Sequence, residues 1–397
     1  MQPGGTTSRR TTGVRCGDGI AVDADLVRAA EAATRAALLS LGGAAPDLAL
    51  VFACGAEPDD VAAALERAGE LSGATTAIGC SAPGVIGGGR GVELTSAVSV
   101  WVGALPGVGL RSFHLEVLRT SESIAVVGMP VRRPDDRAAV MLVDPWSFPV
   151  DAFVEQANDA LPGLPISGAN AIGMRGAGST RLLADGVVRD RGAVGVVLGG
   201  DVVPVPFVSQ GCRPVGPTMT VTAADGNLVL GLAGRPATAK LEELLVQLPP
   251  AEQAMVSSGL LLGVAMDEYA DEHGLGDFLV RRVVGVDAER DGLVVDDVVA
   301  VGQTVQLQVR DAESASHDLD RLLATVPGDV AGALLFACTG RGADLFGTAD
   351  HDVHAIRTGL RTSGVAGMFA AGEIGPVGGR SHLHTFTASV LAFLDRP

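Results

Sequence analysis

The stretch Leu48-Ala-Leu-Val-Phe-Ala-Cys54 is a continuous apolar run of strand length, which is typical of a strand covered on both faces. Near the other end of the chain, Leu334-Leu-Phe-Ala-Cys-Thr-Gly340 repeats its Phe-Ala-Cys core. A helical pattern follows each stretch, and a strand rich in small residues follows each helix. This shared order predicts that the chain contains two copies of one unit.

The segments that follow the two strands also match. Residues 77–87 read AIGCSAPGVIG, and residues 365–375 read VAGMFAAGEIG. When Gly79 is aligned with Gly367, a later glycine and a later isoleucine fall into register as well. The distance from the cysteine of Phe-Ala-Cys to this glycine is 25 residues in one copy and 29 in the other, a loop difference that costs little. We therefore expect an internal duplication, with a binding cleft where the two lobes meet.

The rest of the pattern indicates the fold class. Several apolar runs separated by short Gly-rich turns predict hairpins, so part of each sheet should be antiparallel. Helical periodicity occurs at 25–41, 58–71, 312–324 and 351–362. The predicted class is α/β, with two related lobes, each a mixed, largely antiparallel sheet with helices.

A chain of 397 residues exceeds one ordinary domain, and 47% hydrophobic residues suffice for sizeable cores. Residues 1–20 are polar and rich in Gly and Thr, which predicts a flexible N-terminal segment. The Pro-rich stretch 203–217 predicts a linker or crossover. We therefore divide the chain into a flexible segment (1–20), a first module (21–217) and a second module (218–397).

Charge and cysteine content exclude several classes of protein. The net charge is −17 without any cluster of Lys and Arg, so nucleic acids are not expected as partners. No apolar run reaches the roughly 18–20 residues of a membrane span. The five cysteines are odd in number and show no Cys-x-x-Cys spacing. They favour buried thiols in a reducing cytoplasm over a disulfide framework or a zinc site.

Several motifs follow one another along nearly the whole chain. In the second half they are Gly302-Gln-Thr-Val-Gln-Leu-Gln-Val-Arg-Asp311, Phe336-Ala-Cys-Thr-Gly-Arg-Gly342, Ala370-Ala-Gly-Glu-Ile-Gly-Pro376 and His382-Leu-His-Thr385. In the first half they are Gly79-Cys-Ser81 and Ser167-Gly-Ala-Asn-Ala171. In content and order, these motifs resemble those of FIST-domain proteins, with the N-terminal and C-terminal modules of the family side by side.

The resemblance implies an intracellular bacterial sensory or signal-transduction protein that binds a small-molecule ligand. It also implies a separate signalling partner protein, because no output domain is recognisable in the sequence. Some bacterial proteins of this kind bind haem and sense nitric oxide, so haem is kept as an alternative cofactor. This chain departs from the family at Gly84-Val85-Ile86, where the first module often has Gly-Glu-Ile.

Two charged residues lie at strand ends in the second copy. Glycines beside Glu373 let a ligand approach the backbone, and its carboxylate suits a ligand amine or an ion pair with Arg341. Arg341 follows the strand that ends in Phe-Ala-Cys-Thr, and strand ends at a crevice are common ligand positions. Arginine grips a carboxylate with two parallel hydrogen bonds. For Glu373 the alternatives are a structural ion pair or a helix-capping role, and for Arg341 the alternative is an exposed position.

In the first copy, Cys80 and Ser81 lie at the corresponding turn, and Asn170 lies in a further Gly/Ala-rich strand. All three are predicted to line the cleft. For Cys80 the alternative is a small packing residue of the core, and Asn170 either bonds a ligand or supports a turn. Catalysis by Cys80 requires a neighbouring base, which the sequence does not identify.

The histidines form two pairs. His382 and His384 are one residue apart and share a face if they lie on a strand. Imidazole suits a metal or haem, but no third ligand is clustered with them and aromatic residues that would enclose a haem are few. His384 is included among the ligand-binding candidates. His351 and His354 are three apart on a predicted helix. They are interpreted as solvated, with a second metal site as the alternative.

These observations favour a non-catalytic sensor with a ligand between its two lobes. The predicted ligand contacts are Cys80, Ser81, Asn170, Arg341, Glu373 and His384. One alternative is an enzyme that uses Glu373 as acid or base, or Cys80 as nucleophile. The other is a haem-based nitric-oxide sensor. The sequence contains no GxxxxGK[ST], HExxH or GxSxG motif, and neither catalytic nor metal-binding residues are assigned.

Overall fold

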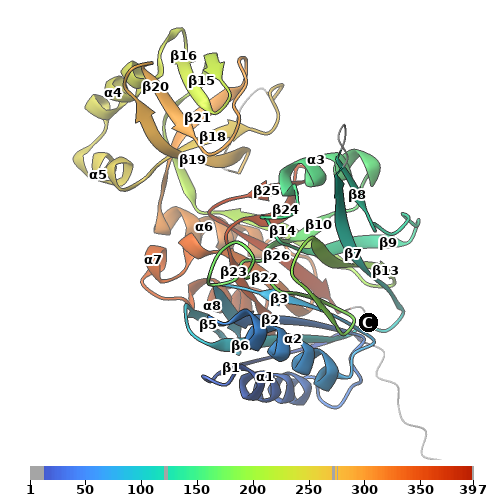
Figure 1. Ribbon diagram of the computed structural model, residues 1–397. Helices are drawn as coiled ribbons and strands as arrows, with labels where there is room; N and C mark the ends of the chain where they lie inside the picture. The colour runs from blue at the N-terminus through green and yellow to red at the C-terminus, as the bar shows by residue number, and fades with distance from the viewer. Residues whose placement is uncertain (1–12, 120–123, 271–272, 275, 396–397) are drawn as a thin grey trace, which may run out of the picture.

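The structure is a computed structural model that describes residues 13–119, 124–270, 273–274 and 276–395. Within these residues the strands form two six-stranded and two seven-stranded sheets. Three sheets contain one parallel pair each among antiparallel pairs, and the fourth is antiparallel throughout. The predicted α/β class, with two related lobes of mixed, largely antiparallel sheet, is confirmed. Figure 1 shows the fourth sheet, with helices α4 and α5, at one end of the molecule.

Apart from the β4–β5 hairpin, the first repeat forms one layer of sheet and one of helix. Its elements are β1 (Arg15–Val22), α1 (Leu26–Ser40), β2 (Leu48–Cys54), α2 (Pro58–Ser72), β3 (Thr76–Ser81), β4 (Gly84–Gly87), β5 (Arg90–Glu93) and β6 (Ala97–Ala104). Asp25 caps α1, and Pro58 in the first turn begins α2. Both helices cover one face of the sheet β1-β6-β2-β3. Residues 15–20, expected in a flexible segment, instead form most of edge strand β1.

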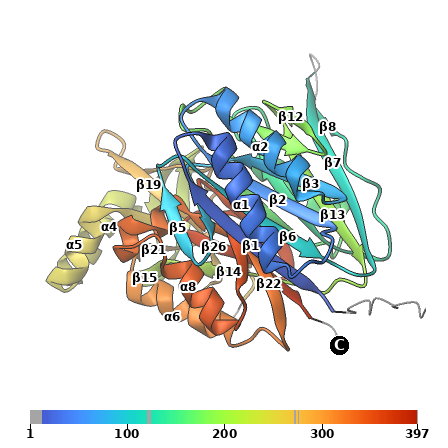
Figure 2. The same cartoon turned by 90° about the horizontal axis from the view of Figure 1, so that it is seen from below.

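The second repeat has the same plan. Its elements are β14 (Pro204–Gln210), α6 (Ala312–Leu323), β22 (Val330–Cys338), η1 (Thr339–Arg341), α7 (Ala343–Phe346), α8 (His351–Gly359), β23 (Gly364–Ala370), β24 (Glu373–Val377), β25 (Arg380–His384) and β26 (Thr387–Leu394). The sheet order β14-β26-β22-β23 reproduces β1-β6-β2-β3. Helices α6 and α8 cover its outer face. Figure 2 shows α1 and α2 along one side of the molecule and α6 and α8 along another.

Matching hydrogen bonds support the duplication at the level of single residues. Phe52 lies opposite Ser99 in the first repeat, and Phe336 lies opposite Ser389 in the second. The Ser99 hydroxyl donates to Ile86 O, and the Ser389 hydroxyl donates to Ile374 O. These two isoleucines are the pair that falls into register when Gly79 is aligned with Gly367. The repeated sequence therefore produces the same strand register twice.

A middle segment links the repeats. Its elements are β7 (Val108–Arg119), β8 (Ile124–Val127), β9 (Asp136–Val143), α3 (Val150–Ala160), β10 (Ile166–Asn170), β11 (Leu182–Ala184), β12 (Val187–Arg189) and β13 (Ala193–Gly200). Most of them form the sheet β10-β9-β13-β7-β8, which α3 covers. The hairpin β11–β12 instead pairs with β3 of the first repeat.

Each half of the chain contributes one β-hairpin to a sheet of the other half. The β4–β5 hairpin of the first repeat pairs with β23 of the second. The β24–β25 hairpin of the second repeat pairs with β10 of the middle segment. Two of the sheets therefore contain strands from both halves of the sequence. The predicted boundary between the two modules at residues 217/218 stays a prediction.

An inserted module interrupts the second repeat between β14 and α6. Its elements are β15 (Cys212–Asp225), β16 (Leu228–Leu232), β17 (Arg235–Pro236), α4 (Ala237–Gln247), α5 (Pro250–Ser258), β18 (Leu260–Ala265), β19 (Phe278–Asp287), β20 (Gly292–Val295) and β21 (Thr304–Arg310). The predicted linker at 203–217 is wrong, because this stretch forms β14 and the start of β15. Its prolines are tolerated at the start and outer positions of strands.

Apolar residues fill the space between the two repeated sheets. The rings of Phe52 and Phe336 meet edge to face with centroids 6.1 Å apart, and those of Trp101 and Phe393 lie 5.0 Å apart. Residues of the middle sheet join the same core. The polar side chains of Ser99 and Ser389 also lie on these inner faces, where each hydroxyl donates to a strand carbonyl. Among the described residues, no helix is long and apolar enough to cross a membrane.

Candidate functional site

A buried ion pair lies directly after β22. Arg341, at the end of η1, is only 1% exposed. Its Nε donates to Asp352 Oδ2 at 2.7 Å, and its Nη2 donates to Asp352 Oδ1 at 2.9 Å. Burial by itself would raise the pKa of Asp352, but the guanidinium outweighs this effect and holds the pKa below its usual range. The pair fixes the first turn of α8 to the end of β22.

This pairing changes the role expected of Arg341. The two parallel hydrogen bonds that the sequence analysis reserved for a ligand carboxylate are made to Asp352 instead. The third guanidinium nitrogen, Nη1, is buried and has no hydrogen-bond partner among the described residues. It lies beside Gly211, where an added Cβ would be 3.1 Å from it. Of the three guanidinium nitrogens, Nη1 is therefore the one available to donate a hydrogen bond to a further group.

Glu373 is completely buried at the start of β24. One carboxyl oxygen accepts from the Gly372 amide at 3.1 Å. The other accepts from the amide and hydroxyl of Thr387 at 3.2 and 2.9 Å. Burial raises the pKa of Glu373 to about 8, against the opposing effect of these hydrogen bonds and of Arg341. Near neutral pH this carboxyl therefore holds a proton for much of the time.

This proton makes stability depend on pH. Because the pKa is raised from 4.5 to about 8, the folded chain binds the proton more tightly than the unfolded chain. The free energy of unfolding should therefore fall as the pH rises from about 4.5 to 8. Glu373→Gln removes this ionisation, so its melting temperature should gain on that of the wild type as the pH increases. Melting curves of both proteins from pH 5 to 9 test this, and parallel profiles would contradict it.

Asn170 and His384 complete a cluster around Glu373. The backbone N–H of Asn170 donates to Gly372 O at 2.9 Å, and its side-chain Nδ2 donates to Ala371 O at 3.0 Å. Its Oδ1 is buried and without a partner among the described residues. His384 lies opposite Glu373 across the β24–β25 pair. The structure thus brings together four of the six predicted contacts: Asn170, Arg341, Glu373 and His384.

Cys80 and Ser81 lie apart from this cluster in the described contacts. Cys80 is fully buried, with its Sγ 3.4 Å from Met368 Sδ. Burial raises the pKa of its thiol, which is unfavourable for a nucleophile. The Ser81 hydroxyl accepts from the amide of Arg181 at 3.0 Å. Both residues therefore connect β3 to its neighbours, as the packing interpretation of Cys80 expected.

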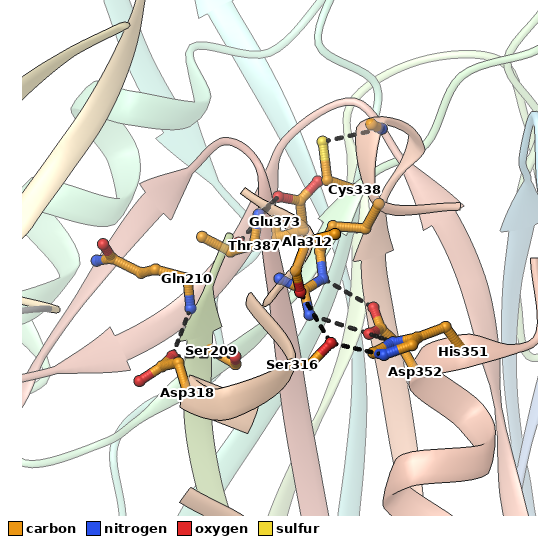
Figure 3. A network of polar contacts seen from close by, with 12 residues as sticks. Ser209, Gln210, Ala312, Ser316, Asp318, Cys338, His351, Asp352, Glu373 and Thr387 are labelled. Atoms are coloured by element: carbon orange, nitrogen blue, oxygen red, sulfur yellow. Dashed lines mark hydrogen bonds and ion pairs between the residues drawn. The ribbon is translucent and has the colours of Figure 1, made fainter. Parts of the chain in front are cut away.

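A hydrogen-bonded chain that the sequence analysis missed connects Asp352 to the surface (Figure 3). His351 Nδ1 lies 3.0 Å from Asp352 Oδ1, and its Nε2 lies 2.9 Å from the Ser316 hydroxyl. The interpretation of His351 as solvated is therefore corrected. The order Ser–His–Asp resembles that of a hydrolase triad. However, the Ser316 hydroxyl donates to Ala312 O in its own helix, so its proton is not directed at His351.

A pocket of about 840 Å³ is lined by residues 338–340, which directly precede Arg341. Strands β18, β19 and β21 of the inserted module form one wall, and residues 338–340 and 344–345 form the other. Phe386 lies between them, with the guanidinium carbons of Arg282 and Arg310 at 5.8 and 5.7 Å from its ring centroid. Of these three residues, only Arg310 lay in a motif singled out from the sequence.

The histidines do not fit a haem. His384 is buried, burial lowers its pKa to about 3, and its Nε2 is hydrogen-bonded to Gly375 O at 2.9 Å. His382 borders a different pocket of about 440 Å³, which is lined by several charged side chains. A haem requires a free imidazole nitrogen facing a largely apolar space, and neither histidine offers this combination.

Comparison with known proteins places the sequence in context. The FIST N domain model matches residues 47–235, and the FIST C domain model matches residues 237–376. Uncharacterized protein Mb0898c of Mycobacterium bovis is 40% identical over 386 residues, which cover 96% of this chain and 99% of that protein. Uncharacterized protein Rv0628c of Mycobacterium tuberculosis is 40% identical over 389 residues, covering 96% and 100%.

Proposed function

Because this chain belongs to the FIST family, whose domains are associated with sensing in signal transduction, we propose that it is a non-catalytic sensor that binds a small molecule. The observation that carries the proposal is the pocket of about 840 Å³ beside the Arg341–Glu373 cluster. Its volume lies within the range of small-molecule sites. We therefore propose that the ligand binds within the second half of the chain, because apolar side chains fill the space between the two repeated sheets.

The position of the pocket supports a sensory role. One wall belongs to the inserted module, and the other includes residues 338–340, the three residues before Arg341. A ligand that draws the two walls together would displace the end of β22. Arg341 would transmit this displacement to α8 through Asp352, because the two side chains share two hydrogen bonds. We propose that a separate partner protein reads this change.

Two further parts of the proposal concern chemistry and location. The burial of Cys80 and the engagement of Glu373 by Thr387 favour binding over catalysis. All five cysteines are free and buried, which is consistent with a reducing compartment. We therefore propose a cytoplasmic location.

A pocket-filling variant tests the proposal. Gly259 borders the pocket, its backbone is nearly extended, and an added Cβ would meet no atom within 4 Å. We expect Gly259→Trp to fold normally and to lose binding, because the indole occupies the ligand's space. Binding is measured as the rise in melting temperature that compounds of a metabolite library produce.

The matched control is Gly285→Trp, since Gly285 lies on β19 outside the pocket lining and its Cβ position is also open. The control should respond to the same compounds as the wild type. The proposal fails if no compound stabilises the wild-type protein, or if Gly259→Trp responds as strongly as the control.

A further inference from the structure

The chemistry of the pocket lining indicates which ligands it accepts. We propose that the pocket selects a small organic anion, namely a carboxylate or phosphate on an apolar body, whose charge is held by Arg282 and Arg310. This inference rests on the proposed function and adds the chemical class of the ligand to it.

The first argument is the charge of the lining. Arg282, Arg310 and Asp344 are its charged residues, so two cations face one carboxylate. The whole chain carries a net charge of −17, so the excess positive charge of this lining is opposite in sign to that of the protein. Low-dielectric walls concentrate such a local field and attract the opposite charge. A cationic ligand would meet two guanidinium groups and a single carboxylate.

The second argument is that the guanidinium groups are available. Among the described residues, no carboxylate pairs with the Arg282 side chain, which lies over the Phe386 ring with its guanidinium carbon 5.8 Å from the ring centroid. Arg310 pairs with Asp344 at 2.7 Å, but the Asp344 side chain is 70% exposed. An exposed pair of this kind contributes little stability. A ligand anion is therefore able to replace Asp344 at Arg310 and to pair with Arg282.

The third argument concerns how firmly Phe386 holds this arrangement. Its backbone has φ +62°, which is uncommon for a residue with a side chain. The Gly211 amide donates to Phe386 O at 3.0 Å, and the neighbouring Thr385 hydroxyl donates to Val280 O at 2.7 Å. Phe386 is thus anchored to both the inserted module and the second repeat. A fixed ring under two arginines pre-orients them toward the pocket.

The fourth argument is the apolar remainder of the lining. Leu260, Leu261, Val283 and Leu345 border the same pocket. A bare inorganic anion would leave the parts of these side chains that face the pocket uncovered, whereas an apolar body attached to the anion would cover them. The lining therefore fits an amphiphilic anion better than a free ion or a polar zwitterion.

Three probes with one ring system separate these alternatives. Their binding to the full chain is measured by isothermal titration calorimetry with 1-naphthoate, 1-naphthamide and 1-naphthylmethylammonium. We expect the anion to bind most tightly, the neutral amide more weakly and the cation weakest. Added salt should weaken naphthoate binding and leave the amide nearly unchanged. Equal or tighter binding of the amide or the cation overturns the inference, as does the absence of naphthoate binding.

Three variants locate the charge that is responsible. Arg282→Gln should weaken naphthoate binding by about tenfold, because one charge-assisted hydrogen bond is lost. Asp344→Asn should tighten it by roughly two- to fivefold, because Arg310 is released from its exposed pair. The control is Arg290→Gln, since Arg290 is an exposed arginine of the same module that pairs with Asp225 outside the pocket. This control should bind naphthoate as the wild type does, and an equal loss in Arg282→Gln and the control would overturn the inference.

The outcomes distinguish this inference from the proposed function. If the amide or cation binds best and Gly259→Trp abolishes that binding, the pocket is a ligand site but the anion class is wrong. If no compound of the library or the probe series is affected by Gly259→Trp, both the site and the class are wrong.

Discussion

Asp352→Asn is expected to lower the free energy of unfolding by about 3–5 kcal/mol. The substitution leaves the guanidinium of Arg341 charged and buried, with its only carboxylate partner among the described residues removed. Desolvating a charge without a counter-ion is among the most costly changes that a single substitution makes. Urea unfolding followed by circular dichroism measures the effect.

The matched control is Glu243→Gln. Glu243 pairs with Arg235 and Lys240 on the exposed surface of α4, where a pair is worth about 0–1 kcal/mol. The double variant Arg341→Met/Asp352→Leu should recover part of the loss, because apolar residues of similar size fill the space without leaving a charge. A loss in Asp352→Asn no larger than in Glu243→Gln would show that the buried pair is not required for the fold.

Gly367→Ala should destabilise the protein by about 3 kcal/mol or more, and loss of soluble folded protein is the extreme form of the same result. Gly367 lies in β23 opposite Leu335 of β22. An added Cβ would lie 1.7 Å from the Leu335 carbonyl oxygen. Because that atom belongs to the backbone of a central strand, it cannot move aside as a flexible side chain would.

The duplication supplies an internal comparison for this experiment. Gly79 occupies the same position in the first repeat, where an added Cβ would lie 2.5 Å from Val51 O. Gly79→Ala should therefore also destabilise the chain, but less than Gly367→Ala. Gly285→Ala, at an open position, should change stability little. Soluble yield and urea midpoints of the three variants test the expected order, and a Gly367→Ala protein as stable as Gly285→Ala would refute it.

The sequence predicted the fold correctly where the signal lies within short segments of the chain. The Phe-Ala-Cys strands and the glycine-containing segments 77–87 and 365–375 predict a buried strand pair with closely spaced backbones. The structure contains this pair twice, as β2–β3 and as β22–β23. The stretch 203–217 was misread because prolines usually interrupt strands. Here Pro204 and Pro206 lie in β14, which is at the edge of its sheet, and an edge strand tolerates the lost donors.

The candidate site was predicted in part for a similar reason. Glycines beside Glu373 indicated that a ligand could approach the backbone there, and Asn170 was expected to bond a ligand or support a turn. In the structure Glu373 and Asn170 both form hydrogen bonds with the backbone of Gly372. The pairing of Arg341 with Asp352 depends on the relative orientation of η1 and α8. The spacing of apolar residues in the sequence contains no information about this orientation. Arg282 reaches the pocket only because the inserted module folds back on the second repeat. Whether these residues bind a ligand remains a prediction.

The exchange of hairpins between the two halves has a consequence for biosynthesis. The ribosome releases β4 and β5 long before β23, the strand on which they pair, has been made. During that interval a hairpin with apolar residues such as Val85 and Ile86 has no sheet to join, and such unpaired strands are prone to aggregate. The nascent first half is therefore expected to need a chaperone, or a slow final assembly step, before the chain is complete. The same exchange means that a gene split between the two halves would encode two fragments, each with an unfinished sheet.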